Sequence, residues 1–382
     1  MSNTILTPDM VVTDSALMLR DELLVANLSN RNYQGQFNGK VGDTVTINVP
    51  SAVAASELAS GGSTSAADIT ETGVDVIIEK HFYTRVDLTA KQLAMEIDEF
   101  NARVAGPVIS GLKNKVEEYA YDKLVGGFVR STDSGTSLNI SGTAGNEPST
   151  LAHIVAARKV LKENKADMSQ LVGIITPTAE ASFLQLNAFT NADYGADRPN
   201  ALREGSLGRL YGTDWFCSPD ASSAFDYGDE PGTVLVDGTA SAGASYIHVD
   251  GFTAADGVIK EGTTFTVAGT ATIYTVTKDA TIATNEADLY VYPALSAEEA
   301  DGDALTFQTA PTQNVIYNPR AFAGAIVAPP AASANSAMGS ADGVQVRIIA
   351  DTSTSSLATT WVWDVFCGFK AVKQQHGVLL QG

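Results

Sequence analysis

The chain has 382 residues, of which 44% are hydrophobic and 18% are charged, and its formal net charge is −20. This length and apolar content allow a buried core, favour two or three domains and argue against disorder. The negative charge disfavours non-specific binding to nucleic acid or anionic membranes, because phosphate contacts need clustered Lys and Arg.

The N-terminal sequence has no basic start followed by an apolar run, and no stretch approaches the roughly 20 apolar residues of a membrane-spanning helix. We therefore expect a protein that is made and assembled in the cytoplasm, without membrane association. The two cysteines, Cys217 and Cys367, lie far apart without CxxC spacing or matching histidines. This pattern favours buried free thiols over a disulfide or a metal site.

An amphipathic helix is predicted near the N terminus, over residues 14–31. Asp14 or Ser15 is the expected N-cap, because a short oxygen-bearing side chain accepts hydrogen bonds from the first free N–H groups of a helix. Behind this cap, leucines recur at helical spacing and form one broad apolar stripe. These residues are Leu17, Leu19, Leu23, Leu24 and Leu28.

A long β-hairpin is predicted next. Residues 39–50 alternate apolar and polar side chains and end in a proline, and residues 72–89 alternate again. The segment between them, residues 51–68, is small and polar without a period, as in a loop. A hairpin with little core of its own is only marginally stable. We expect it to lie on another surface, for which a neighbouring subunit is one candidate.

The middle of the chain alternates helices and strands. Residues 91–124 predict one long helix, or two helices that meet at Gly106 and Pro107, where proline removes a backbone donor. After a glycine- and serine-rich stretch, a helix over 149–166 and a helix over 178–186 flank a short buried strand. This alternation predicts an α/β or α+β core.

Residues 232–310 have a different pattern. Six short candidate strands follow one another closely, with Gly and Asp between them, which predicts a small barrel or sandwich. The candidates are residues 233–238, 245–250, 263–269, 273–278, 288–293 and 304–309. Because the mixed pattern resumes afterwards, we interpret this module as an insertion, which a host tolerates when its two loop ends lie close together.

After the module, residues 314–327 predict a strand followed by a helix. Residues 342–351 and 359–372 predict a strand pair, and residues 376–382 a terminal strand. Trp361 and Trp363 alternate with valine and point to one face of the second of these strands. Core packing and a subunit contact are the two interpretations of this tryptophan pair.

The sequence contains none of four common catalytic or cofactor-binding motifs: the phosphate-binding loop, the dinucleotide-binding GxGxxG, the nucleophile elbow GxSxG and the metalloprotease HExxH. The scattered histidines are expected in packing or surface roles. They are His81, His153, His248 and His376. Two acidic runs have partial oxygen-ligand spacing but complete no calcium loop, so solvated turns are expected. Their acids are Asp193, Asp197, Glu299, Asp301 and Asp303. We expect no enzyme, no cofactor and no metal.

The order of these elements and four specific stretches carry a resemblance. The stretches are NLSNRNYQGQFNGKVGDTVTINVP, KHFYTRVDLTAKQLAMEIDEFNARVAGPVISGLKNKVEEYAYDKL, NALREGSLGRLYGTDWFCS and GTTFTVAG. The chain resembles the major capsid (coat) proteins of tailed bacteriophages, in particular the P-twenty-two-like coat protein family with the HK-ninety-seven fold. The resemblance spans nearly the whole chain.

The resemblance implies an α+β fold of the HK-ninety-seven type with an inserted small all-β barrel domain. The barrel is expected to support folding of its host domain and contacts between capsomers, although its linker near residues 278–288 is short, so a long loop between capsomers is reduced or absent. The implied segments are 1–35 as the N-terminal arm, 36–90 as the extended loop, 91–149 as the peripheral domain with the spine helix, 150–231 as the first part of the axial domain, 232–310 as the barrel and 311–382 as the second part of the axial domain.

The implied function is self-assembly into the icosahedral head shell of a tailed double-stranded DNA phage. The chain would form hexamers and pentamers with itself, with a scaffolding protein, a portal protein and, as an open question, a decoration protein as partners. It would enclose the DNA without sequence-specific binding and reside in the virion. The alternative is a surface or secreted binding protein with an Ig-like β-module, against which the missing signal peptide argues.

The assembly contacts expected from this interpretation lie in three places: the hairpin tip, the stripe of the arm helix and the tryptophan strand. The residues are Glu57, Leu58, Asp68, Leu17, Leu24, Trp361 and Trp363.

Overall fold

The computed structural model of the chain describes residues 8–37, 42–50, 71–89, 100–128, 140–141, 146–186, 207–219, 228, 232–270, 272–307, 313–331, 335–353 and 358–382. The chain divides into two compact units, each built from separate stretches of sequence. The first unit comprises Met1–Leu23, Ser29–Val116 and Phe322–Lys373, and the second comprises Leu24–Leu28, Glu117–Ala321 and Gln374–Gly382.

The N-terminal helix α1 (Pro8–Glu22) begins six residues before the predicted cap. Proline suits a first helical turn, because its missing N–H would have no partner there and its φ is already helical. Both expected cap residues lie inside the helix and bond to other elements. The Asp14 carboxylate accepts from the Asn101 amide at 2.8 Å, and the Ser15 hydroxyl accepts from the indole N–H of Trp363 at 3.2 Å. The predicted cap is therefore wrong. The helix is confirmed in part, because α1 ends at Glu22 and not near residue 31.

The predicted hairpin is confirmed as an antiparallel pair of β1 (Thr44–Pro50) and β2 (Glu71–Ile77), in which Pro50 lies opposite Glu71. The long return strand is interrupted after Ile77, because Ile78 exchanges hydrogen bonds with the 42–43 segment rather than continuing the ladder. The chain resumes as β3 (Lys80–Thr89) in a different sheet. One alternating pattern in the sequence thus corresponds to two strands.

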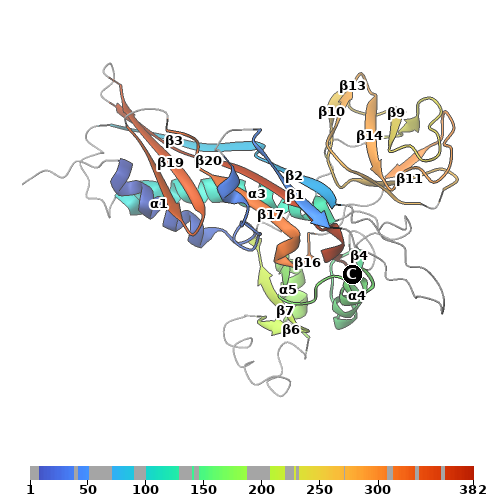
Figure 1. The fold of residues 1–382 in the computed structure, drawn as a ribbon, viewed down its shortest axis with the longest axis horizontal. Coiled ribbons are helices and arrows are strands. Elements are labelled where there is room, and N and C mark those ends of the chain that lie inside the picture. Colours follow the sequence, from blue (N-terminus) through green and yellow to red (C-terminus); the bar gives the residue numbers. More distant parts are fainter. Residues whose placement is uncertain are drawn as a thin grey trace, which may run out of the picture. The chain divides into compact units, whose positions relative to one another are not determined.

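The main sheet of the first unit is arranged around β20 (Ala358–Ala371). On one edge β20 pairs with β3 from Ala358 to Cys367, and on the other it pairs first with β19 (Val344–Thr352) and then with β17 (Phe322–Val327). β18 (Ser336–Ala341) extends the sheet beyond β19. Figure 1 shows β3, β19 and β20 running side by side.

The predicted helix after Asn318 is wrong. A short 3-10 turn, η5 (Pro319–Ala321), leads into β17, and all six residues of β17 are buried. A strand that is buried on both faces has no polar alternation, so its apolar run cannot be distinguished by period from a buried helix. The strand pair predicted for residues 342–351 and 359–372 is confirmed as β19 and β20.

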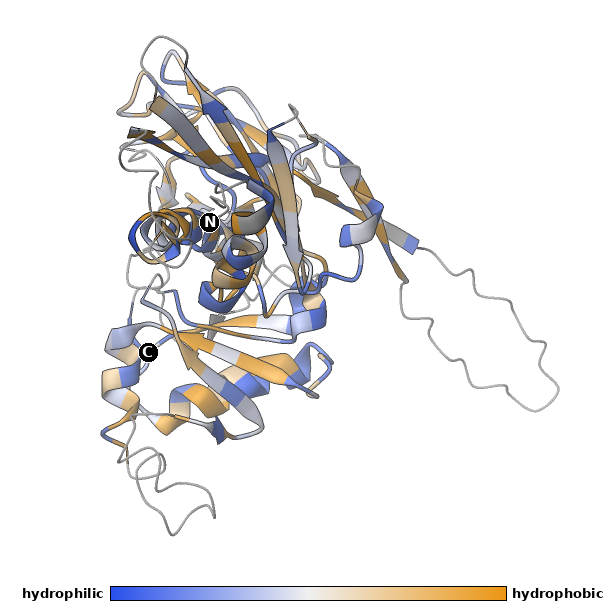
Figure 2. Cartoon of the chain, turned by 90° about the vertical axis from the view of Figure 1, so that its left-hand side faces the viewer, coloured by the Kyte–Doolittle hydropathy of each residue, from blue (hydrophilic) through white to orange (hydrophobic). Residues whose placement is uncertain are grey.

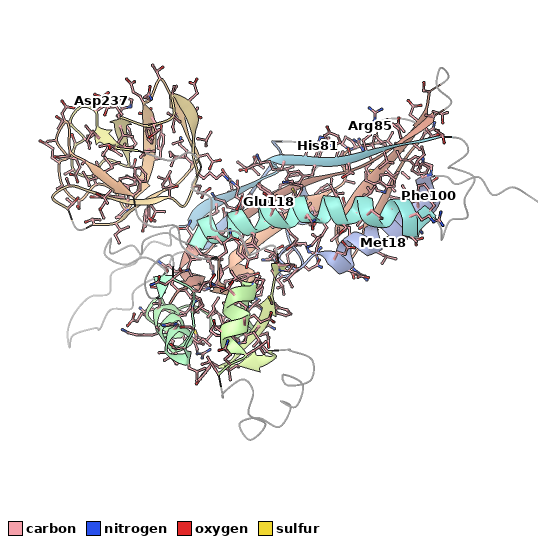
Figure 3. All side chains as sticks on the ribbon, turned by 180° about the vertical axis from the view of Figure 1, so that it is seen from behind. Met18, His81, Arg85, Phe100, Glu118 and Asp237 are labelled. Carbon is pink, nitrogen blue, oxygen red and sulfur yellow. The ribbon has the colours of Figure 1, made fainter. Side chains whose placement is uncertain are left out.

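The helical run described from Phe100 changes type at the proline. A π-helical turn, η2 (Asn101–Ala105), precedes α3 (Gly106–Phe128), and the N–H of Gly106 bonds to the carbonyl of Asn101. A π-turn shifts the hydrogen-bond register by one residue at a point where Pro107 could not donate. Of the two alternatives, the described residues favour one helical run, which changes from π-helical to α-helical at Gly106 and continues through Pro107. Figure 3 shows α3 as one long helix.

The second unit contains a six-stranded mixed sheet in the order β4-β21-β16-β5-β7-β6. Its strands are β4 (Ile140–Ser141), β5 (Leu171–Ile175), β6 (Arg209–Leu210), β7 (Thr213–Cys217), β16 (Val315–Tyr317) and β21 (Gly377–Leu380). Helices α4 (Leu151–Glu163) and α5 (Pro177–Phe183) share its hydrophobic core. Figure 2 shows the strands of this sheet coloured largely as hydrophobic. The predicted α+β core is confirmed.

The inserted module of the second unit is a barrel of short strands. One sheet has the order β15-β11-β12-β14-β9-β8, and β10 pairs with β13. The bounds are β8 (Leu235–Val236), β9 (Tyr246–Asp250), β10 (Asp256–Ile259), β11 (Thr264–Val267), β12 (Tyr274–Val276), β13 (Ala280–Ala283), β14 (Ala287–Tyr292) and β15 (Leu305–Phe307). All six predicted strands exist, and β10 and β13 were not predicted.

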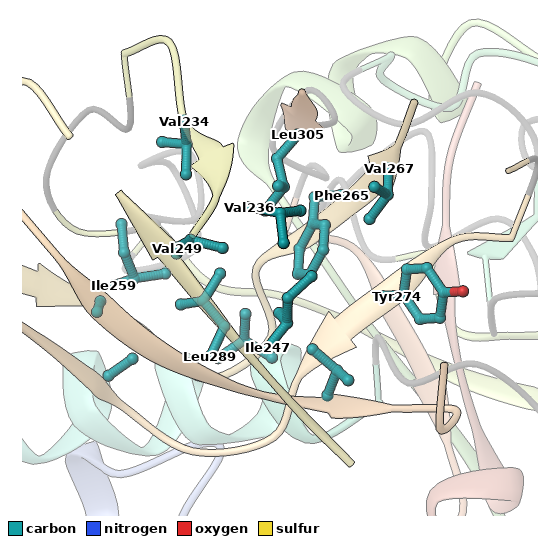
Figure 4. Packing of buried hydrophobic residues seen from close by; sticks show 14 of the residues in the cluster. Val234, Val236, Ile247, Val249, Ile259, Phe265, Val267, Tyr274, Leu289 and Leu305 are labelled. Carbon is teal, nitrogen blue, oxygen red and sulfur yellow. The ribbon is translucent and has the colours of Figure 1, made fainter. Parts of the chain in front are cut away.

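The barrel closes where its chain enters and leaves. The N–H of Leu305 donates to Val234 at 2.9 Å, and the N–H of Val236 donates to Asp303 at 2.9 Å, so the first and last strands lie side by side. Alternate residues point inward, as in β14, where Leu289 is buried and Asp288 is exposed. The inner residues form one cluster (Figure 4). This adjacency of the two ends supports the interpretation of an insertion.

The range 311–382, expected as the second part of the axial domain, is shared between the two compact units. Residues Phe322–Lys373 belong to the first unit, with the arm helix and the hairpin, whereas Gln374–Gly382 belong to the second. The long pairing of β20 with β3 joins the first of these segments to a strand far away in sequence. The expected domain boundaries stay predictions.

A glycine-to-alanine pair tests the packing of the arm helix. α1 lies against β18, and a Cβ at Gly339 would stand 2.6 Å from the carbonyl oxygen of Val12. We expect Gly339→Ala to lower the free energy of unfolding by about 1–3 kcal/mol, because the helix must shift. The measurement is urea denaturation followed by tryptophan fluorescence.

The matched control for this substitution is Gly111→Ala in α3, where a Cβ would meet no atom within 4 Å. There alanine should raise the stability by about 0.5–1 kcal/mol, because it restricts the unfolded chain and favours the helix. Equal effects of the two substitutions would contradict close packing of α1 on β18.

Candidate assembly surfaces

The predicted leucine stripe is divided between α1, with Leu17 and Leu19, and the segment after it, with Leu23, Leu24 and Leu28. Leu19 and Leu23 are buried, Leu24 is half-buried, and Leu17 keeps 38% of its surface exposed. Leu17 is therefore accessible to another subunit, and Leu24 is accessible only in part. Their role as assembly contacts stays a prediction.

The segment after the arm helix is held by a buried carboxylate. Glu117 of α3 is fully buried, and its Oε1 accepts from the N–H groups of Leu24 at 3.0 Å and Ala26 at 3.3 Å, while its Oε2 accepts from Val25 at 3.0 Å. Leu28 donates back to Leu24, which closes one helical turn. A carboxylate at the start of such a turn satisfies donors that have no partner within it.

The two tryptophans of β20 lie in the core of the first unit. Trp361 and Trp363 are 1% and 0% exposed, their rings stack at 5.9 Å between centroids, and Phe100 lies 5.0 Å from Trp361. This packing agrees with the interpretation of the two tryptophans as core residues. Their role as assembly contacts stays a prediction.

A buried ion pair crosses the centre of the same sheet. The guanidinium of Arg347 on β19 forms two hydrogen bonds to the carboxylate of Asp364 on β20, and His81 on β3 lies 2.9 Å from the same carboxylate. The His81 ring also packs edge-on against Phe366 at 4.7 Å. His81 thus links β3 to β20, and Asp364 continues this link to Arg347 on β19. These contacts agree with a packing role for His81.

A polar pocket lies beside the arm, lined by Arg31, Gln34, Asp342 and Gly343 among others. Burial lowers the pKa of Arg31, and its buried Nη1 has no hydrogen-bond partner within the part of the chain that the structure describes. The carboxylate of Asp342 bonds to Arg20 at 2.7 Å. The pocket therefore offers a donor suited to an acidic or carbonyl group.

The hairpin-tip residues Glu57, Leu58 and Asp68 lie outside the described residues, as do Asp193 and Asp197. Toward the tip, Val49 and Val74 are only half-buried, whereas Ile47 and Val76 near the base belong to a core cluster. Burial within the chain thus decreases along the hairpin toward the tip.

The described thiols are poor nucleophiles. Both cysteines are free, and Cys367 is buried as predicted, whereas Cys217 is only half-buried. Burial, followed by Glu180, raises the pKa of Cys217 to about 12, and burial raises the pKa of Cys367 well above its usual value. Thiolates, not thiols, are reactive. His153 lies near the start of α4, where its Nδ1 accepts from the N–H of Ser149, and His376 lies in the 3-10 turn η6 (Gln374–His376).

The second acidic run differs from the solvated turn that was expected. Glu299 is buried, and its backbone pairs with Ala240 across the barrel. Asp301 and Asp303 instead accept backbone N–H groups from Gly238 and Ala300. Burial, followed by the charge of Asp303, raises the pKa of Glu299.

Three comparisons place this fold. A family model described as phage capsid protein matches residues 108–248. A chain from Mycobacterium phage Che8 is 16% identical, with a TM-score of 0.51 and coverage of 93% of this chain and 90% of that chain. The asymmetric unit of the bacteriophage PhiM1 mature capsid is 11% identical, with a TM-score of 0.50 and coverage of 93% and 86%. No curated protein matches the sequence.

The arm helix, the hairpin, the long α3 and the inserted barrel form an α+β fold of the HK-ninety-seven type. The match of residues 108–248 to the phage capsid family model agrees with the expectation of a tailed-phage major capsid protein. The alternative of an Ig-like binding protein is not favoured. No helix among the described residues is both long and apolar enough to cross a membrane.

Substitution of Glu117 tests the anchor of the 24–28 turn. Glu117→Ala should lower the free energy of unfolding by about 3 kcal/mol or more, because three buried N–H groups lose their acceptor. Glu118→Ala, at the exposed neighbouring position, should change it by about 0.5 kcal/mol or less. Urea denaturation of the full chain measures both. Equal losses in the two variants would mean that the carboxylate of Glu117 does not hold the turn.

The buried Glu299 gives a prediction with a pH dependence. Its pKa is raised in the folded state, so its ionisation opposes folding fully above that pKa, and the effect disappears below the ordinary pKa of about 4.3. Glu299→Gln should therefore increase amide protection of residues 232–307 at pH 7 but not near pH 4. Hydrogen exchange is the suitable measurement, because none of the three tryptophans lies in the barrel.

The exposed neighbour Glu298 provides the control, since Glu298→Gln should leave barrel protection unchanged at both pH values. A loss of protection in Glu299→Gln at pH 7 would contradict the assigned cost of the buried charge.

Proposed function

We propose that the chain is the major structural subunit of the head shell of a tailed double-stranded DNA phage, and that copies of it form hexamers and pentamers of a closed icosahedral particle. The observation that carries the proposal is a fold of the phage capsid type that matches known examples over 93% of the chain. The absence of a recognised catalytic motif in the sequence is consistent with a structural role.

The hairpin is the first proposed contact between subunits. A two-stranded ribbon is marginally stable alone, and the described part of this one joins a core cluster of the unit near its base, through Ile47 and Val76. A neighbouring subunit beneath the ribbon would complete its burial. Such a contact joins unlike surfaces of two copies, and repeated contacts of this kind close into rings. The tip residues Glu57, Leu58 and Asp68 are the proposed contacts.

The arm provides a second proposed contact. Leu17 is an exposed apolar side chain on a helix that is otherwise packed against its own sheet. The pocket at Arg31 lies next to the arm and contains a donor without a partner among the described residues. A carboxylate from an adjacent copy would accept a hydrogen bond from this donor and would pair with its positive charge. Both features support assembly through the arm.

The charge of the chain bears on its cargo and its partners. A net charge of −20 suits a shell that encloses DNA without adhering to it. The family makes the chain a component of the virion. Assembly in the host cytoplasm, with a scaffolding protein and a portal protein and with or without a decoration protein, is part of the proposal.

Replacement of residues 51–70 by Asn-Gly tests the role of the hairpin tip. This turn fits because Pro50 and Glu71 are opposite each other in the ladder and Asn-Gly favours a two-residue hairpin loop. We expect a folded subunit, with wild-type circular dichroism and tryptophan emission, that forms no closed particles by electron microscopy. Expression with neighbouring genes from the same source provides the missing partners.

A second variant replaces the same residues by a Gly/Ser segment of equal length. It keeps the length of the tip but removes its side chains, so it shows which of the two is needed for assembly. If specific contacts at Glu57, Leu58 and Asp68 are needed, this variant also fails to assemble. Normal shells from the Asn-Gly variant would overturn the proposed role of the tip, and the lack of particles from the wild-type chain under every condition would overturn the proposed function.

A further inference from the structure

Four side chains on the outer face of the barrel converge on one point. His248 lies on β9, and Asp288 is its direct partner on β14. On the other side, Asp237 follows β8, and its N–H donates to the carbonyl of His248 at 3.0 Å. Glu286 immediately precedes β14. Three neighbouring strands of one sheet therefore fix the positions of these groups.

The scaffold beneath this cluster is well determined. Glu286 ends a tight turn in which Ala283 and Glu286 exchange hydrogen bonds at 2.9 and 3.1 Å. Within the turn, the side chain of Asn285 donates to the carbonyl of Phe252 at 2.7 Å. The backbone at Glu286 is thus fixed from two sides. Metal and ligand sites are more exact when they are built on strands and anchored turns than on free loops.

The hydrogen bond of His248 decides which ring nitrogen is available. Nδ1 lies 2.7 Å from a carboxylate oxygen of Asp288. An ionised carboxylate only accepts, so Nδ1 carries a proton, and in the neutral form of the ring Nε2 presents a lone pair to an ion. This carboxylate–histidine arrangement is the usual outer shell of a metal-bound histidine, because it sets the tautomer and orients the ring.

The free Nε2 faces two further carboxylates, at 3.4 Å from Asp237 and 3.9 Å from Glu286. One ligand atom from each of the three residues can be chosen so that all lie within 4.8 Å of one another. In a tetrahedral zinc site with bonds of about 2.0–2.2 Å, ligand atoms stand roughly 3.3–3.5 Å apart. Small side-chain rotations would close the remaining gap.

Charge favours a cation at this place. Three carboxylates surround one histidine, and among the ion pairs of the described residues Asp237, Glu286 and Asp288 pair only with His248. Asp237 and Glu286 are exposed and His248 is half-buried, so an ion can enter from solvent. Figure 3 labels Asp237 on the barrel.

We propose that Asp237, His248 and Glu286 form a binding site for a divalent transition metal ion of the zinc type, with Asp288 as the positioning residue of the histidine. One imidazole nitrogen and two carboxylate oxygens leave a fourth position for water, or for a ligand atom from another molecule. Imidazole as the central ligand selects ions such as Zn²⁺ over Mg²⁺ and Ca²⁺, which prefer oxygen.

The site would add stability to the inserted barrel. It joins β8, β9 and β14, and an ion that binds only the folded barrel stabilises it in proportion to the logarithm of the free ion concentration. This inference is independent of the proposed shell function, since it concerns the barrel of each single chain.

Titration of the full chain with Zn²⁺, followed by calorimetry and by hydrogen exchange of residues 232–307, tests the site. We expect binding together with increased amide protection at β8, β9 and β14. His248→Ala should weaken the binding at least 100-fold. Asp237→Asn should weaken it as well, which keeps the test valid if either variant proves unstable. Glu298→Gln, an exposed carboxylate on the same barrel, should bind like the wild type.

The visible absorption of bound Co²⁺ reports directly on the coordination of the ion. It would not depend on His248 if this residue had only a structural role. The wild type should show the visible absorption of a four-coordinate site, and His248→Ala should lose it. Asp288→Asn should keep the spectrum but require about 10–100-fold more metal, because it disturbs only the outer shell. Equal Zn²⁺ affinity in the wild type and His248→Ala, or equal protection of the wild type by Ca²⁺, would overturn the proposal.

Discussion

The first unit depends on the pairing of one strand on both of its edges. β20 contacts β3 along ten residues on one side and β19 and β17 in turn on the other. It therefore joins the segment that follows the hairpin to the C-terminal third of the chain. A strand in this position is largely withdrawn from water, which explains its apolar composition and its tryptophans. The hairpin can extend away from the unit because the strand that continues it is fixed here.

Polar groups buried in the two units connect segments that apolar packing alone would leave free to slide. The carboxylate of Asp364 on β20 contacts both Arg347 on β19 and His81 on β3. Both contacts form together in only one register of the three strands. Glu117 plays a similar part for the turn after the arm helix. Buried charges are costly unless they are paired, and each of these carboxylates has specific partners. Both groups therefore determine register and attachment, while the apolar core supplies most of the burial.

The sequence predicted local structure well and long-range pairing poorly. Alternation identified six barrel strands and both strands of the hairpin, because a half-exposed strand has a period of two. β17 was missed since all its residues are buried, and the pairing of β20 with β3 was not predicted because the two strands lie far apart in sequence. Glu117 had a detectable signal, as it shares a helix face with Ala120, Tyr121 and Leu124, all of them buried. The His248 group had none, because its members come together only through the sheet.

The closure of the barrel has a consequence for modularity. The strands that enter and leave it are hydrogen-bonded neighbours, so the barrel is joined to its host through two adjacent chain ends, and Lys123 of α3 adds an ion pair to Glu261 of the barrel at 3.9 Å. A domain whose termini lie equally close could replace the barrel without moving the two chain ends of the host. In a repeated assembly, such an exchange would present the new domain once per copy. The insertion point is therefore a position at which a foreign domain can be attached to every subunit.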